Sequence, residues 1–257
     1  MGLKLPKLNL SGISNKSVMG KLLRFPLRLI PQDMILPILQ GRLKGEKWIV
    51  GSSNHGCWLG SYEFNKQRAF IRTIKPGNTV YDIGANVGFY TLLSSVLVGP
   101  KGKVIAFEPL PRNVFLLTKH MQINHCPNVT IYQYAVSDNT GEACFNPSSN
   151  PCMGHLSEGG EIKVKTVALD ELILLGDVPP PEVLKIDVEG AEDRVLRGAE
   201  HTINRHKPII FLSTHSPKVH HSCCERLKTL EYSLMALSHN TLEYSDDILA
   251  IPALTAK

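Results

Sequence analysis

The pattern of hydrophobic and polar residues in this 257-residue chain changes near residue 79. Before that point, short apolar stretches are repeatedly interrupted by proline, which stands at Pro6, Pro26, Pro31 and Pro37. Proline lacks a backbone donor and obstructs a continuing helix, so we predict short helices broken at each proline over residues 1–50. A loop over residues 51–64 and a helix over residues 65–75 are expected to follow.

From residue 79 onward, short apolar runs alternate with longer segments of helical composition. The predicted strands cover residues 79–83, 103–107, 129–135, 183–186, 208–212, 233–237 and 248–251. The predicted helices cover residues 89–98, 112–124, 191–206 and 218–230, with a helical turn starting at Asp170. This alternation predicts an α/β fold with a mostly parallel sheet and helices on both faces.

The length supports one large domain with an N-terminal extension. We predict a helical extension or cap over residues 1–64 and one α/β domain over residues 65–257. Glycine and serine in residues 141–166 indicate an inserted loop or hairpin.

The composition is typical of a soluble globular protein, with 43% hydrophobic and 20% charged residues, and excludes collagenous and disordered classes. The longest uncharged run, residues 83–100, contains three glycines, so no transmembrane segment is predicted. The six cysteines are scattered without a CxxC pair. Reduced thiols and a cytoplasmic location fit this spacing better than a disulfide framework.

Positive charge is concentrated at the N-terminus. Residues 1–50 hold nine basic and two acidic residues, whereas the whole chain has a net charge of +5. A basic arm can contact nucleic acid, anionic lipid or an acidic partner. The arm lacks the dense Lys/Arg runs typical of phosphate-backbone binding, so we expect a solvated surface and no nucleic-acid partner.

The strongest motif is VYDIGANVGFYT at residues 80–91, where a strand enters a glycine-bearing turn and then a helix. Gly84 and Gly88 let the backbone approach a ligand without an intervening Cβ. Their GxxxG spacing differs from the dinucleotide fingerprint GxGxxG, and no Gly-Lys-Ser/Thr follows. Glu108 ends the next strand, about where a doubly wound fold places the acid that binds two ribose hydroxyls.

A glycine turn followed by a ribose-binding acid predicts a nucleoside ligand that lacks a pyrophosphate. S-adenosylmethionine is such a ligand. We expect Asp82 to face its ammonium group, backbone N–H groups to meet its carboxylate, and Asp138 to accept from the adenine amino group. The predicted cofactor-binding residues are Asp82, Gly84, Asn86, Gly88, Thr91, Glu108 and Asp138.

Several stretches occur together in one order: GCWLGSYE, DIGANVGFYTLL, AFEPLPRN, TVALDEL and LKIDVEGAEDRVLRGA. Over about residues 45–215 the chain resembles the FkbM-type methyltransferases, within the Rossmann-like class I fold that uses S-adenosylmethionine. The resemblance implies a seven-stranded sheet whose last strand is antiparallel. It also implies O-methylation of a hydroxyl on a sugar, glycan or natural product, although some relatives methylate carboxyl groups. Nucleic-acid methylation and non-catalytic cofactor binding remain alternatives.

In class I folds the acceptor approaches over the carboxyl ends of the fourth and fifth strands. Asp187 follows the fourth predicted strand and His215 follows the fifth, so we predict these two as catalytic residues. Methyl transfer depends on alignment, and a hydroxyl nucleophile also benefits from a base. Relatives often place an acid two residues before this histidine, but Ser213 stands there, which puts a His–Glu pair in doubt and favours Asp187.

The predicted acceptor contacts are Trp58, Glu63, His155 and Glu189. Trp58 can stack on a sugar face or pack the N-terminal segment onto the sheet. Similarly, Asp187 and Glu189 can contact the acceptor or cap the helix beginning near residue 191.

The sequence offers two candidate metal-binding sites, and we predict neither. Asp187 and Glu189 offer oxygen ligands for a divalent ion, but the sequence shows no third ligand. The run HHSCC at residues 220–224 matches no zinc-binding spacing. Neither the acceptor's identity nor the oligomeric state follows from the sequence.

Overall fold

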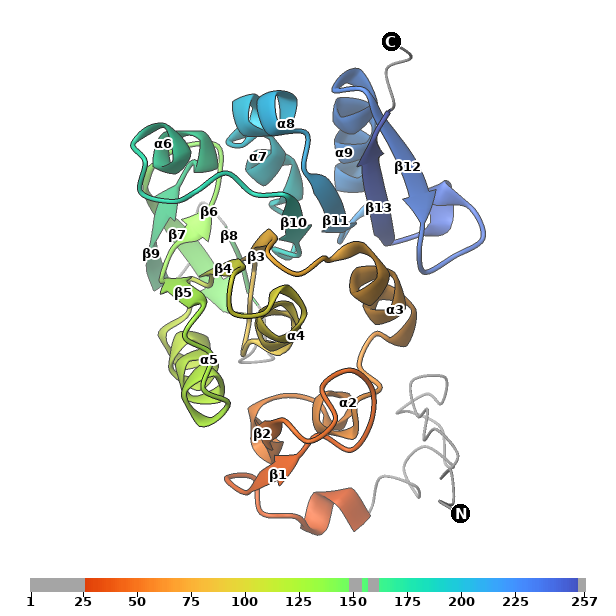
Figure 1. Ribbon diagram of the computed structural model, residues 1–257. Helices are drawn as coiled ribbons and strands as arrows, with labels where there is room; N and C mark the ends of the chain where they lie inside the picture. Colours follow the sequence, from red (N-terminus) through yellow and green to blue (C-terminus); the bar gives the residue numbers. More distant parts are fainter. Residues whose placement is uncertain (1–25, 148–153, 157–161, 254–257) are drawn as a thin grey trace.

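The computed structural model describes residues 26–147, 154–156 and 162–253, which form an N-terminal segment with a two-stranded sheet, followed by two larger β-sheets and their helices (Figure 1). The N-terminal segment consists of η1 (Pro26–Leu29), β1 (Ile35–Pro37), β2 (Lys47–Ile49), η2 (Val50–Ser52) and α2 (His55–Leu59). The prediction of proline-broken helices is wrong for most of residues 26–50, because β1 and β2 pair in antiparallel fashion. Pro37 is tolerated there because it ends a strand that has only one neighbour.

The main sheet has seven strands in the order β12-β13-β11-β10-β3-β4-β5. These strands are β3 (Thr79–Ile83), β4 (Lys103–Phe107), β5 (Val129–Tyr132), β10 (Val183–Ile186), β11 (Ile209–Ser213), β12 (Tyr232–Ala236) and β13 (Asp247–Pro252). Only β13 runs antiparallel to its two neighbours. The expected α/β fold, with a mostly parallel sheet and a reversed last strand, is therefore confirmed.

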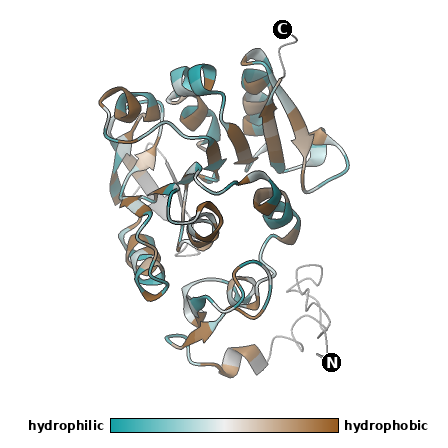
Figure 2. Cartoon of the chain, in the orientation of Figure 1, coloured by the Kyte–Doolittle hydropathy of each residue, from teal (hydrophilic) through white to brown (hydrophobic). Residues whose placement is uncertain are grey.

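Helices cover both faces of this sheet, because its strands direct alternate apolar side chains to opposite sides. Val80 packs in one hydrophobic cluster with α3 (Phe64–Thr73), α4 (Phe89–Val98) and α5 (Pro111–Ile123). Tyr81, the next residue, packs in a second cluster with α6 (Leu169–Leu174), α7 (Glu192–Arg197), α8 (Glu200–His206) and α9 (Pro217–Thr229). Figure 2 shows hydrophobic residues concentrated in the central strands.

The second sheet contains the segment predicted as an insertion. It consists of β6 (Ala135–Val136), β7 (Gly141–Pro147), β8 (Gly154–Leu156) and β9 (Ile162–Val167). β7 pairs antiparallel with both β8 and β9. The remaining element is η3 (Leu242–Tyr244), between β12 and β13.

Three local predictions are wrong. The segment 51–64 contains α2, whose first turn is capped by the Asn54 side chain accepting from the Gly56 N–H. The strand predicted over 129–135 is split between β5 and β6, which belong to different sheets. The helix predicted over 191–206 is divided at Gly198, where a Cβ would overlap the Ser137 carbonyl oxygen.

The N-terminal segment shares its core with the main sheet. Trp48 is fully buried, and Trp48 and Trp58 lie in the same hydrophobic cluster as Phe89 on α4. The division at residue 64 stays a prediction, but α2 and β2 pack directly on the larger fold. Within the described residues, no helix combines the length and apolar character needed to cross a membrane.

Candidate active site

A cavity of about 560 Å³ lies at the carboxyl ends of β3, β4, β10 and β11. This size is within the range of small-molecule sites. One end is formed by the turn after β3, by Glu108 and by the Ala135–Val136 backbone region. The other end is formed by Asp187, Glu189 and His215. We call these the cofactor end and the acceptor end.

The turn after β3 depends on two glycines for different reasons. Gly84 lines the cavity at φ 74°, and a Cβ there would overlap the Asp187 carbonyl oxygen. Gly88 has φ 94°, and a Cβ there would overlap the Leu117 side chain of α5. Gly88 is not part of the cavity lining, so its role is to let α4 and α5 pack closely.

Glu108 is held firmly at the cofactor end. It is 5% exposed, and its carboxylate accepts hydrogen bonds from Asn86 N–H (2.8 Å), Leu110 N–H (3.0 Å) and the Asn113 side chain (3.2 Å). Burial raises the pKa of the Glu108 carboxyl, and these hydrogen bonds offset part of the rise. A carboxylate fixed by protein donors keeps lone pairs for further donors, such as ribose hydroxyls.

Asp82 and Thr91 lie beneath the turn instead of in the cavity lining. Asp82 is fully buried, forms an ion pair with Lys185 Nζ (3.1 Å) and accepts a hydrogen bond from Thr91 Oγ1 (2.6 Å). Lys185 Nζ also donates to the Gly84 carbonyl oxygen (3.0 Å). The prediction that Asp82 faces the cofactor is therefore replaced by a supporting role for the Asp82–Lys185 pair.

The turn is also supported by a histidine that sequence reasoning missed. His120 on α5 is fully buried, stacks on Trp48 and approaches the Val87 carbonyl oxygen with Nδ1 (2.7 Å). Its Nε2 accepts a hydrogen bond from Ile49 N–H (3.2 Å). Because a carbonyl can only accept and an amide N–H can only donate, the ring must be neutral, with its proton on Nδ1. Burial accordingly lowers the pKa of His120 to about 4.

Two further predicted contacts, Asp138 and Trp58, are not among the residues that line the cavity. Asp138 pairs with Arg197 (3.3 Å), outside the lining, so the adenine contact predicted for it lacks support. Trp58 is 3% exposed and donates to His55, which matches packing of the N-terminal segment instead of acceptor stacking. The side chain of His155 lies outside the described part of the structure. Glu63, in contrast, does line the cavity.

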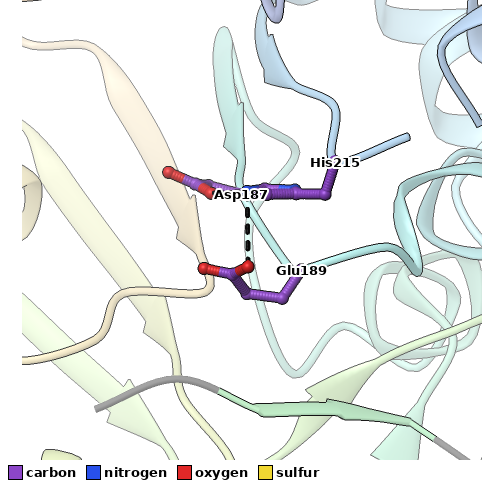
Figure 3. A group of neighbouring side chains, drawn as sticks. All are labelled: Asp187, Glu189 and His215. Carbon is purple, nitrogen blue, oxygen red and sulfur yellow. Dashed lines mark ion pairs between the residues drawn. The ribbon is translucent and has the colours of Figure 1, made fainter. Parts of the chain in front are cut away.

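The acceptor end brings together side chains from two strand ends (Figure 3). His215 Nε2 lies 3.5 Å from Asp187 Oδ1 and 3.6 Å from Glu189 Oε2. On the other side of the ring, Nδ1 lies 2.7 Å from Oε1 of Glu192, which is fully buried on α7. His215 therefore has an acidic partner after all: Glu192 on α7 supplies the carboxylate that is missing at position 213, where the chain has a serine.

The charges around His215 decide its protonation. Burial alone would lower its pKa, but the hydrogen bond with Glu192 and the nearby Asp187 and Glu189 charges raise the pKa of His215 to about 9. Burial tends to raise the pKa of Asp187, yet Lys185, Lys66 and His215 together hold it below its ordinary value. At neutral pH the described side chains therefore place an imidazolium beside the ionised carboxylate of Asp187.

Lys66 on α3 is a second residue that sequence reasoning missed. Its side chain is 3% exposed, and Nζ lies 3.0 Å from Glu63, 3.0 Å from Asp247 and 3.5 Å from Asp187 Oδ2. It also donates to Ser213 Oγ (2.6 Å). In the sequence, Lys66 is recognisable only as a lysine within the predicted helix 65–75. The fold is needed to show which carboxylates its side chain contacts.

This fold, with its glycine turn and fixed acid at the ends of β3 and β4, defines the class I methyltransferases, whose methyl donor is S-adenosylmethionine. The chain belongs to the methyltransferase FkbM domain family, which it matches over residues 82–240.

Two curated relatives and one solved structure illustrate the similarity. The chain is 34% identical over 134 residues to the hexuronic acid methyltransferase AglP of Haloferax volcanii, covering 51% of this chain and 54% of that protein. It is 28% identical over 175 residues to the 31-O-demethyl-FK506 methyltransferase FkbM of Streptomyces tacrolimicus, covering 54% and 66%. It therefore spans between about half and two thirds of these relatives' length.

The solved structure is the methyltransferase FkbM from Methylobacillus flagellatus. It superposes with a TM-score of 0.51 at 18% identity, covering 77% of this chain and 55% of that one. At this identity the similarity concerns the fold alone.

Proposed function

We propose that this protein transfers a methyl group from S-adenosylmethionine to a hydroxyl of a sugar, a glycan or a natural product. The observation that carries this proposal is one cavity lined by the fixed, buried carboxylate of Glu108 and by the Asp187–Glu189–His215 group. An oxygen acceptor is supported by two relatives, the hexuronic acid methyltransferase AglP and the 31-O-demethyl-FK506 methyltransferase FkbM.

The residues of the cofactor end fit the donor. Glu108 would accept the ribose hydroxyls, while Gly84 and Asn86 bring the backbone of the turn to the ligand. When bound, S-adenosylmethionine supplies an electrophilic methyl group on a sulfonium. The ion pair of Asp82 with Lys185 keeps the turn in place from below.

The charge of the acceptor end favours a neutral acceptor group. Asp187, Glu189 and Glu192 present carboxylates to the His215 ring, whereas Lys66 and Lys185 approach the other oxygen of Asp187, away from the ring. A carboxylate or a phosphate backbone would be repelled by these carboxylates. A hydroxyl can instead donate a hydrogen bond to one of them, which supports a hydroxyl over the carboxyl and nucleic-acid alternatives.

Asp187 and His215 are the residues we assign to catalysis. His215 carries its proton at neutral pH, because its pKa is about 9, and cannot by itself remove the hydroxyl proton. Asp187 remains ionised and can accept a hydrogen bond from the acceptor hydroxyl, which orients its oxygen. Its lowered pKa makes it a weak base, so alignment is expected to supply much of the rate.

The direct test is a mass-spectrometric screen with S-adenosylmethionine carrying a CD3 group. The purified chain is incubated with hexuronic acids, neutral sugars and hydroxylated glycosides. We expect transfer of one CD3 group to a hydroxyl oxygen, and its loss in the Asp187→Asn variant. Transfer only to the carboxylates of the hexuronic acids would contradict the proposal.

A further inference from the structure

We infer that Asp187, Glu189 and His215 form a binding site for one divalent metal ion at the acceptor end of the cavity. The sequence offered only the two carboxylates, and the fold supplies the third ligand from the end of β11. The binding of the ion stands on the geometry alone, whereas its role in the reaction rests on the proposed methyl transfer.

The three ligand atoms converge on one point. Asp187, Glu189 and His215 each offer one ligand atom, and these three atoms lie within 4.8 Å of one another (Figure 3). His215 Nε2 is 3.5 Å from Asp187 Oδ1 and 3.6 Å from Glu189 Oε2. Neighbouring ligands of an octahedral ion at about 2.1–2.4 Å are roughly 3.0–3.4 Å apart. Small side-chain movements therefore suffice to bring all three atoms to one ion.

Glu192 provides the outer contact that a metal-binding histidine normally has. Histidine ligands usually donate their other ring N–H to a carboxylate, which fixes the tautomer and the ring orientation. Here Nδ1 lies 2.7 Å from Glu192 Oε1, and Glu192 is itself fixed by the Gly190 N–H (2.9 Å). With the Nδ1 proton directed to Glu192, the Nε2 proton lies on the side of Asp187 and Glu189, and a bound ion would displace that proton and take its place on Nε2.

The charges leave room for a cation. Lys66 and Lys185 approach Oδ2 of Asp187, at 3.5 and 3.7 Å, and leave Oδ1 facing His215. Neither lysine forms an ion pair with Glu189 or Glu192 among the described residues. An ion bound by two carboxylates and one imidazole would balance this charge, and mixed oxygen and nitrogen ligands suit Mn²⁺ or a similar first-row ion.

Such an ion would activate the acceptor hydroxyl. A divalent ion stabilises the alkoxide character that develops on an oxygen bound to it, which lowers the pKa of the hydroxyl. The hydroxyl proton leaves to water, and the oxygen then forms a bond to the methyl carbon. The C–S bond breaks with its electron pair remaining on sulfur, which becomes a neutral thioether.

Binding is tested with Mn²⁺ alone, by electron paramagnetic resonance of the free ion and by calorimetry. We expect one Mn²⁺ per chain after removal of metals with EDTA. Glu189→Gln and His215→Ala should each weaken binding at least 10-fold. Asp138→Asn removes a carboxylate outside the cavity and should leave binding unchanged. If His215→Ala fails to fold, Glu189→Gln decides alone, because that side chain is partly exposed.

Absence of Mn²⁺ binding at millimolar concentration would overturn the site, as would binding that both variants retain. Binding that behaves as expected without methyl transfer to any hydroxyl would leave the site standing and reject the proposed function. Inhibition by EDTA that Mn²⁺ reverses in the wild type would connect the ion with turnover.

Discussion

The two ends of the cavity are built in different ways. At the cofactor end, the glycine turn, Glu108 and Asn113 lie within about one strand–helix–strand unit, and backbone N–H groups make two of the contacts to Glu108. At the acceptor end, charged side chains from α3, β10, α7 and the end of β11 meet around Asp187 and His215. The cofactor end is thus a local backbone structure, and the acceptor end is a long-range charge cluster.

The two histidines show the same contrast. His120 supports the cofactor end as a neutral ring between a carbonyl and an amide N–H. His215 stands at the acceptor end among three carboxylates, which keep it charged. Histidine is therefore neutral at the cofactor end, where backbone dipoles surround it, and protonated at the acceptor end, where carboxylates surround it.

The largest expected effect comes from Gly84→Ala at the point where the two ends touch. The new Cβ would overlap the Asp187 carbonyl oxygen, and φ is already 74°. We expect a loss of about 3 kcal/mol or more in the free energy of unfolding, measured by urea denaturation, together with loss of S-adenosylhomocysteine binding.

The matched control is Gly77→Ala. Gly77 has φ 89°, but a Cβ added there would meet no atom within 4 Å, so only the backbone strain remains. Its expected cost is about 1 kcal/mol. Equal losses in the two variants would show that the close approach at Gly84 is unimportant.

A smaller effect is expected from protonation of His120. Its folded-state pKa of about 4 lies below the ordinary value of about 6.5, so the unfolded chain binds the proton more readily. The stabilisation is complete above about pH 6.5 and is lost as the pH falls through about 4. It amounts to about 3 kcal/mol at most.

Urea denaturation between pH 7 and pH 4.5 measures this loss. His120→Gln should reduce the pH dependence of the free energy of unfolding, whereas His201→Gln, at an exposed position on α8, should leave it unchanged. The wild-type His120 resonance in NMR should show no titration near pH 6.5. A normal titration there would contradict the neutral ring.

The same contrast explains what the sequence predicts and what it does not. Strands β3, β4 and β10 and helix α4 were predicted with their observed bounds, because each is a mainly apolar run followed directly by glycine or an acidic residue. Glu108 was predicted because its distance from the glycine turn is fixed by one strand–helix–strand unit.

Long-range contacts could not be predicted in this way. Glu192 and Lys66 reach His215 and Asp187 only because β10 and β11 are neighbours and α3 packs at their ends. Asp82 was expected to line the cavity. Instead it forms a buried ion pair with Lys185 on the adjacent strand. The sequence allowed Trp58 either to stack on a sugar or to pack the N-terminal segment onto the sheet, and its burial in the structure favours packing.

The measurement that tests the account most directly is calorimetry of S-adenosylhomocysteine binding to two carboxylate variants, one at each end of the cavity. Glu108→Gln should weaken binding about 10–100-fold, because the amide meets protein N–H donors and loses the charge-assisted bonds to the ribose. Glu189→Gln should change the affinity less than about twofold. Similar losses in both variants, or an unchanged affinity for Glu108→Gln, would contradict the division of the cavity into a cofactor end and an acceptor end.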